Sequence, residues 1–334
     1  MLKVSDIRLK PALLDGCIGV FPQALRTYKM QQADQTSYPR LKPLMTSGTQ
    51  FTRLLLLLLA VTFAQGQKPA AKPLPDDAGQ FIRAVIQNEI SVQENDRSHW
   101  MYKLHREDEK NVQDRQVIET MRGNLARTLV LNGHSLTPEE RARDDERMRK
   151  LVNDPKEQAR IEQREHDDAQ QAQLLLKAFP AAFVFKYDGE DADLVRLKFT
   201  PNPHYSPPNR KLAVLHSLAG TLWVDPAALH VAKIEGRLFE DVNLLLGLGH
   251  LDKGGAFGVV QKNIGDGHWE IVSLDLNMHG RAVFFKTISV KQKQTFSGFQ
   301  RVRDDLTFAQ AYEMLHTLDQ PAVAARPQQG ATQK

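Results

Sequence analysis

The sequence predicts a mainly β protein with some helix: a large curved antiparallel sheet, a half-open barrel, covered by helices, with a long polar helical insert at residues 138–178. Three observations support this fold class. Residues 98–131 and much of 183–302 alternate apolar and polar side chains with the period of two typical of half-buried strands. Turn residues such as Gly265-Asp266-Gly267 separate these segments. Many strands in meander order favour an antiparallel sheet over a βαβ fold.

The first predicted element is a short helix, and three strands follow it. Residues 78–90 place their apolar side chains near one face of a helix, and Asp76 or Asp77 can cap its start. From residue 98 the period changes to two, with turns near 108–110 and at Gly123. We therefore expect three antiparallel strands after the helix.

A long polar helical segment comes next. Thr137-Pro138-Glu139-Glu140 combines a cap residue, proline at the first helical position and acids in the first turn. The helix should end near Asn153-Asp154-Pro155 and resume from Lys156 to Ala178. Its charges are dense and alternate in sign, which indicates an exposed helical hairpin with ion pairs along it. A coiled-coil partner would need a sustained apolar heptad, which the segment lacks.

After Pro180 the chain returns to strands, and a helix at Leu306–Leu318 closes the domain, which spans residues 78–318. Residues 319–334 have the composition of a disordered tail. A turn is expected at His279-Gly280. The predicted strands are Phe183–Tyr187, Leu194–Thr200, Leu212–Ser217, Gly220–Val224, His230–Glu240, Ala256–Ile264, Trp269–Met278, Arg281–Lys291 and Thr295–Val302.

The N-terminal region predicts export from the cytoplasm. Leu54–Phe63 is an unbroken apolar run, preceded by Arg53 and followed by small residues, which is the pattern of a signal peptide. Cleavage after Gly66 or after Ala64 fits, and the core is short for a membrane span of roughly 20 residues. The protein is therefore expected to be periplasmic or secreted, and peripheral to a membrane at most.

The signal peptide sets the expected boundaries of the N-terminal region. It would occupy residues 45–66 with translation starting at Met45, so that residues 1–44 are a non-native upstream extension or disordered. Residues 67–77, which contain three prolines, are expected to be a flexible linker.

Charge and cysteine content exclude several function classes. The net charge of +4 comes from residues 1–66, which hold eight Lys or Arg and three Asp, so the remaining chain is nearly neutral and nucleic acid is not an expected partner. Cys17, the single cysteine, precedes the predicted mature chain, which therefore has no disulfide or thiolate chemistry.

No motif in the sequence predicts catalysis, a cofactor or a metal site. The glycines of residues 247–258 lack the GK[ST] ending of a phosphate loop, and they favour a loop between strands. The sequence contains no HExxH metal motif and no GxSxG serine elbow. The acidic residues of the 188–193 turn lack EF-hand spacing and are typical of a solvated hairpin tip.

The apolar face of the sheet is the candidate ligand site. A single-layer sheet must cover one face, and with few amphipathic helices available part of that face could enclose an apolar pocket. The alternative is that the same side chains form a filled core. The candidate lining residues, chosen by alternation, are Trp100, Tyr102, Leu104, Leu129, Phe183, Phe185, Trp223, Phe284 and Ile288.

Short motifs give a resemblance to a known family. Gly220-Thr-Leu-Trp-Val-Asp225, followed by the strand at 230–240, resembles the strand pair of periplasmic lipoprotein carriers of the LolA/LolB type. Glu119-Thr120 and Arg127-Thr-Leu-Val-Leu-Asn-Gly133 are similar to the opening of RseB-type sensor domains. The resemblance covers roughly residues 78–303 and implies a half-open antiparallel barrel that binds acyl chains. The polar segment at 138–178 departs from the family pattern, and the arginine with which the carriers hand over lipoproteins has no counterpart here.

These observations predict a non-enzymatic binding protein for a lipid or a lipoprotein acyl chain. Burial of acyl surface would drive binding, at about 0.8 kcal/mol per CH₂ group. The alternative is an envelope interaction or sensor module whose sheet is filled and whose polar helical segment meets a protein partner. A hydrolase with an unrecognised site is the third interpretation.

Overall fold

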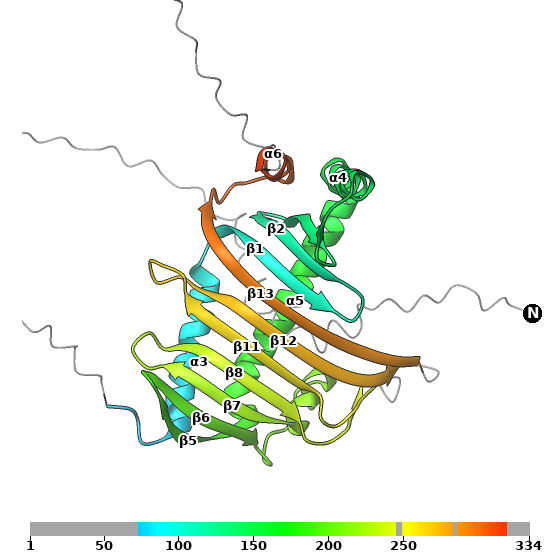
Figure 1. The fold of residues 1–334 in the computed structure, drawn as a ribbon. Helices are drawn as coiled ribbons and strands as arrows, with labels where there is room; N and C mark the ends of the chain where they lie inside the picture. Colours follow the sequence, from blue (N-terminus) through cyan, green and yellow to red (C-terminus); the bar gives the residue numbers. More distant parts are fainter. Residues whose placement is uncertain (1–72, 245–248, 283–285, 319–334) are drawn as a thin grey trace, which may run out of the picture.

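A computed structural model describes residues 73–244, 249–282 and 286–318 of the chain. Its thirteen strands form one antiparallel sheet that does not close on itself, so the predicted fold class is confirmed (Figure 1). The strands are β1 (His99–Asp108), β2 (Val112–Thr120), β3 (Gly123–Leu131), β4 (His134–Ser135), β5 (Phe183–Asp191), β6 (Leu194–Pro201), β7 (Leu218–Asp225), β8 (His230–Leu238), β9 (Val242–Leu244), β10 (Gly249–Leu251), β11 (Ala256–Asn263), β12 (Trp269–Ala282) and β13 (Lys286–Val302).

The order of the strands brings the two ends of the domain together. The main path is β4-β3-β2-β1-β13-β12-β11-β8-β7-β6-β5, and β9 and β10 pair beside β12. The first strand, β1, pairs with the last, β13, from His99 opposite Val302 to Asp108 opposite Gln292. The pairing of β1 with β13 therefore joins the N-terminal and C-terminal strands of the domain within the sheet. Strand β5 and the β3-β4 hairpin form the two edges of the sheet.

Helices lie on both faces of this sheet, α3 and α5 on one face and α4 and α6 on the opposite face at its β2-β3 end. Figure 1 shows α3 and α5 behind the sheet, and α4 and α6 near β2. We call the face that packs on α3 and α5 the covered face. The described helices are α3 (Ala78–Asn95), α4 (Pro138–Asn153), α5 (Pro155–Ala182), the 3₁₀ helix η3 (Arg210–Ser217) and α6 (Phe308–Leu318).

The two polar helices begin as the sequence predicts. Thr137 accepts a hydrogen bond from the Glu140 amide at 3.2 Å, and the Glu140 carboxylate accepts one from the Thr137 amide at 2.9 Å, which completes a capping box for α4. Asp154 ends α4 and caps α5 by accepting from the amides of Lys156 and Glu157. Asp144 of α4 accepts from the Thr128 amide, so α4 also covers the open edge of β3.

The second polar helix is not the exposed arm that its charges predict. From Ala169 onward α5 buries one stripe of side chains against the sheet, with the spacing of three and four that a packed helix shows. The prediction of an exposed hairpin at 138–178 is therefore wrong for residues 169–178, and the helix continues to Ala182. The buried residues on this stripe are Ala169, Ala172, Leu175, Phe179 and Ala182.

Three predictions about the strands are also wrong. Residues 286–302 form the single strand β13, where the sequence predicts two strands, Arg281–Lys291 and Thr295–Val302. Residues 212–217, predicted to be a strand, form the end of η3, which Asn209 caps. The turn predicted at His279-Gly280 is absent, because β12 continues to Ala282 and pairs with β13 beyond that point. Gly280 is required there for another reason: a Cβ atom would overlap the His250 carbonyl oxygen of β10.

Two hydrophobic clusters hold the domain together. The larger lies between α3, α5 and the covered face, and Trp100, Tyr102 and Val117 extend it to β1 and β2. The smaller lies on the opposite side of β1 and β2, where Ile118 and Leu125 meet α4 and α6. Neighbouring residues Val117 and Ile118 point into different clusters, so this end of the sheet is covered on both sides.

The described domain begins after the predicted signal peptide, linker and upstream extension, most of which lie outside the described residues.

Candidate ligand site

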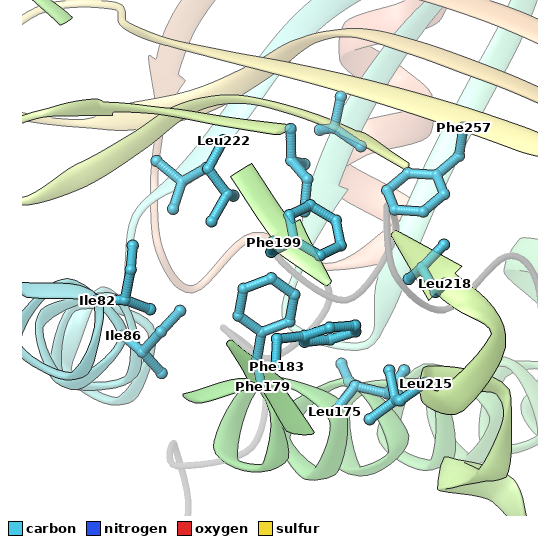
Figure 2. Packing of buried hydrophobic residues seen from close by; sticks show 14 of the residues in the cluster. Ile82, Ile86, Leu175, Phe179, Phe183, Phe199, Leu215, Leu218, Leu222 and Phe257 are labelled. Carbon is cyan, nitrogen blue, oxygen red and sulfur yellow. The ribbon is translucent and has the colours of Figure 1, made fainter. Parts of the chain in front are cut away.

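The covered face contains a small apolar cavity beneath α3 and α5. Its volume is about 40 Å³, enough for a few water-sized positions and far below the roughly 300–1,000 Å³ of ordinary ligand pockets. Figure 2 shows Ile82 and Ile86 of α3 facing Leu175 and Phe179 of α5, with Phe199 and Leu222 from the sheet. The lining residues are Ile86, Glu89, Gln93, Ala172, Leu175, Leu176, Phe179, Leu222, Val231 and Ile234.

Aromatic packing closes one end of this cavity. The Phe179 ring lies 4.9 Å from Phe183, 5.6 Å from Phe185 and 5.4 Å from Phe199, measured between ring centroids. The tilted and edge-on geometries are those that aromatic pairs prefer. Two predicted lining residues, Phe183 and Phe185, thus point toward α5 and belong to the larger cluster.

A buried polar group marks the other side of the cavity. Glu89 of α3 accepts a hydrogen bond from the Val231 amide at 2.7 Å, and its carboxylate lies 3.2 Å from His230 Nδ1. The His230 ring stacks on Trp269 at 5.0 Å. Since a buried carboxylate needs such donors, this group is a structural anchor that fixes α3 on the β7-β8 hairpin.

A surface groove runs between the two helices above the cavity. Its volume is about 690 Å³, and Ile86 borders both the groove and the cavity below. Glu94 of α3 bridges the helices by accepting a hydrogen bond from Gln173 of α5 at 3.0 Å. The groove residues are Arg83, Ile86, Gln87, Ile90, Glu94, Lys177, Pro180 and Ala181. The groove therefore combines apolar side chains with the charged side chains of Arg83, Glu94 and Lys177.

Three further predicted lining residues follow the covered face of β1. Trp100 and Tyr102 are buried in the larger cluster, and Leu104 packs against it half-buried. The Tyr102 ring meets Phe296 at 5.9 Å. These side chains belong to the same apolar cluster as the cavity, although they do not line it.

The remaining predicted lining residues lie elsewhere. Trp223 is on the opposite face of β7, where Lys233 Nζ lies 4.3 Å from its ring and its indole nitrogen donates to Asp191. The side chains of Leu222 and Val224 lie on the covered face instead, so Trp223 does not line the predicted ligand site. Leu129 is half-buried in β3. Phe284 lies outside the described residues, and of Ile288 only the place in β13 is described.

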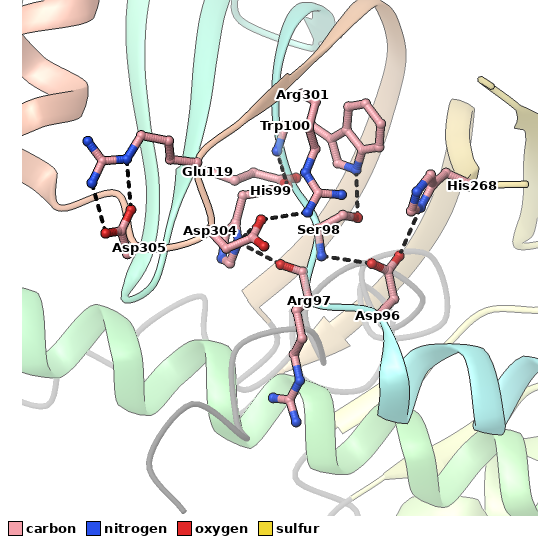
Figure 3. Close-up of polar contacts among 11 residues, drawn as sticks. Asp96, Arg97, Ser98, His99, Trp100, Glu119, His268, Arg301, Asp304 and Asp305 are labelled. Atoms are coloured by element: carbon pink, nitrogen blue, oxygen red, sulfur yellow. Dashed lines mark hydrogen bonds and ion pairs between the residues drawn. The ribbon is translucent and has the colours of Figure 1, made fainter. Parts of the chain in front are cut away.

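A polar junction fixes the C-terminal end of α3 to the sheet (Figure 3). Asp96 accepts from the Ser98 amide at 2.7 Å and lies 3.6 Å from His268. Trp100 donates from its indole nitrogen to the Ser98 hydroxyl, and its ring meets His268 edge-on at 5.3 Å. Arg301 of β13 lies over the same ring. These contacts join α3, β1 and β13.

Sequence reasoning missed the α5 residues of the cavity. Ala172, Leu175 and Phe179 carry a helical spacing that could have been noticed, but the charges of the preceding turns masked it.

Within the part of the chain that the structure describes, no group of His, Cys, Asp or Glu is placed to hold a metal ion. None of the described helices is long and apolar enough to cross a bilayer.

Comparison of the chain with family models, with curated proteins and with solved structures finds no match.

Proposed function

We propose that this protein binds a lipid or the acyl chain of a lipoprotein between α3, α5 and the covered face of the sheet, outside the cytoplasm. The proposal rests on one observation: the apolar cavity and the surface groove lie next to each other, and Ile86 lines both. The groove lies at the protein surface, and the cavity lies within the larger hydrophobic cluster. The apolar run at Leu54–Phe63 supports an exported protein.

The cavity must enlarge for a chain to bind. At about 40 Å³ it admits only a few methylene groups, so the helices have to separate along the groove. Each methylene group then buried contributes about 0.8 kcal/mol, so a long chain can offset the lost contacts between the helices. A protein of this kind would alternate between a filled state, which the structure describes, and an open state.

The test is organic extraction of the purified chain, followed by lipid mass spectrometry. We expect an acyl species at near-unit stoichiometry. Ala172→Leu, which fills the cavity, should reduce this yield, whereas Leu174→Phe on the exposed side of α5 should not. An extract free of lipid, together with no uptake of added fatty acid or lipopeptide, would overturn the proposal.

One observation favours a second function. The small volume of the cavity is also what a filled core shows, and Leu174 exposes 44% of its surface on α5. A module that uses this helix to contact an envelope protein would need no ligand. Lipid-free protein whose Leu174→Glu variant loses a cross-linked partner would support this second function.

A further inference from the structure

The covered face changes from apolar to cationic along β1. Because alternate residues of a strand share a face, Trp100, Tyr102, Leu104 and Arg106 follow one another on this side. The first two are buried, Leu104 is half-buried, and the Arg106 side chain is 35% exposed. An apolar track therefore ends at a guanidinium group.

The two strands beside β1 also change from apolar to polar residues, β13 opposite Arg106 and β2 one pair earlier, opposite Leu104. On β13, Phe296 lies opposite Leu104 and Gln294 lies opposite Arg106. On β2, Val117 lies opposite Tyr102, followed on the same face by Arg115. Each of the three neighbouring strands thus passes from hydrophobic to polar side chains between the positions of Tyr102 and Arg106, so the change is not confined to one strand.

The two arginines are close to each other and incompletely satisfied. Arg106 and Arg115 occupy diagonal positions on the same face of adjacent strands, since Arg115 lies opposite Leu104. The buried Nε of Arg115 makes no hydrogen bond among the described residues, although a terminal nitrogen of the same side chain donates to Gln113. The Nε of Arg106 has one carboxylate neighbour, Asp108. Burial, together with the positive charges of Arg147 and Arg106, lowers the pKa of the Arg115 guanidinium.

The nearby carboxylates already have other partners. Asp108 lies 3.3 Å from Arg106 Nε, but it also accepts from the amides of Lys110 and Asn111. Asp144 accepts from the Thr128 amide and from Arg147. The charges that act on Arg115 are therefore those of two arginines, Arg106 and Arg147, and of two carboxylates, Asp108 and Asp144, that already accept other hydrogen bonds. An added anion would balance the excess positive charge of the three arginines.

We propose that Arg106 and Arg115 bind the phosphate group of an acyl ligand whose chain lies along the apolar track of the covered face. The inference rests on the proposed function, because it assigns the headgroup of the same ligand. Guanidinium groups suit this role, since each can donate two parallel hydrogen bonds to phosphate oxygens. The residues on the apolar side, Tyr102, Leu104 and Phe296, would contact the first carbons of the chain.

The experiment measures binding of three probes to the purified chain by titration calorimetry: dodecyl phosphate, dodecanol and inorganic phosphate. The variant is Arg106→Gln/Arg115→Gln. Its matched control is Lys103→Gln/Lys293→Gln, which removes two cations from exposed positions on the other face of β1 and β13. Circular dichroism and thermal melting show whether each variant folds.

We expect the arginine variant to bind dodecyl phosphate about 10- to 100-fold more weakly, because charge-assisted hydrogen bonds to the anion are lost. Dodecanol binding should stay within about twofold in both variants, and the control should bind every probe normally. Equal weakening of dodecyl phosphate and dodecanol in a folded arginine variant would overturn the inference, because the pair would then act only on packing.

Two further outcomes separate this inference from the proposed function. If both amphiphiles bind the unmodified chain equally and the arginine variant changes neither, the acyl site stands and the headgroup site is overturned. If neither amphiphile binds but inorganic phosphate binds and is lost in the variant, the proposed function fails and the arginines bind free phosphate instead. Absence of binding by all three probes overturns both.

Discussion

Helices α3 and α5 cover the same face of the sheet by different kinds of contact. Helix α3 is joined to the sheet by directional polar bonds: Asn88 donates to the carbonyl oxygens of Ala228 and Leu229, and Glu89 accepts from Val231. Over the same region α5 presents Ala172, Leu175 and Phe179 and packs through them. Over this region α3 is thus held to the sheet by directional bonds and α5 by apolar contacts, although α5 is also hydrogen-bonded through Gln173 to α3 and at its C-terminal end to Asn202.

This difference indicates which helix would move if the proposed ligand enters. A hydrogen bond has a narrow optimum in distance and angle, so sliding α3 would leave buried groups such as Glu89 without partners. Hydrophobic packing is non-directional, and an acyl chain can replace the contacts of α5 with similar ones. We therefore expect α3 to stay on the sheet while α5 shifts outward.

The largest expected effect tests how much the apolar packing of α5 contributes to the free energy of unfolding. Phe179→Ala should lower the free energy of unfolding by about 3–5 kcal/mol, because it removes a buried ring that three other phenylalanines contact. Denaturant unfolding measures the change. Leu174→Ala, on the exposed side of the same helix, should change the stability by less than about 0.5 kcal/mol. Similar losses in both variants would contradict the packing that the structure shows.

The next effect tests the polar anchor of α3. Glu89→Gln keeps the shape of the side chain but removes the charge that His230 and the Val231 amide face, so stability should fall by about 2 kcal/mol. Glu94→Gln makes the same change at a half-buried position of α3 and should cost little. Thermal unfolding compares the two variants, and equal losses would mean that α3 is not anchored through Glu89.

The sequence predicted elements well where one residue decides them. The Thr137-Pro138 start of α4, the break near Asn153-Asp154-Pro155 and the turn at Gly123 depend on local chemistry, and the structure confirms all three. The closing helix also forms, from Phe308 to Leu318. Local signals are sufficient for such features because capping and turn geometry involve residues only a few positions apart.

The faces of the elements could not be predicted in the same way. Leu222, Trp223 and Val224 are all apolar, so alternation leaves both phases open, and pairing with β6 and β8 decides that Trp223 faces outward. Gly280 has the appearance of a turn residue, but its role is the close approach of β10. In both cases a residue distant in sequence sets the outcome, and no local pattern contains that information.

The third prediction concerns a titrating group on α5. Burial, and secondarily the charge of Asp168, raises the pKa of Glu165 from 4.5 to about 7. Between these values the folded chain holds a proton that the unfolded chain has lost, so this group makes stability fall as the pH rises from about 4.5 to 7. Glu165→Gln should therefore raise stability at pH 8 by about 1–2 kcal/mol, less than the full shift implies because the group is only partly buried.

Unfolding curves at pH 5 and pH 8 check this effect. At pH 5 the variant and the unmodified chain should differ by less than about 0.5 kcal/mol, because the buried carboxyl is already neutral. Glu162→Gln, on an exposed part of the same helix, serves as the control. If the gain from Glu165→Gln were the same at both pH values, ionisation of Glu165 would not be its cause.

The smallest expected effect on stability gives the sharpest test of which helix moves. Glu94 and Gln173 form a hydrogen bond between half-buried groups across the groove, so replacing both by cysteine should cost less than about 1 kcal/mol. In a Cys17→Ser background these are the only two thiols, and a short bis-maleimide can join α3 to α5. Linked protein should take up added fatty acid at least tenfold more slowly than the same variant capped with N-ethylmaleimide.

A linker between Asn88→Cys and Leu229→Cys, which ties α3 to the hairpin that already holds it, should leave uptake unchanged. If this second linker slows uptake and the first does not, α3 is the helix that moves, and directional bonding does not decide which part of this fold opens.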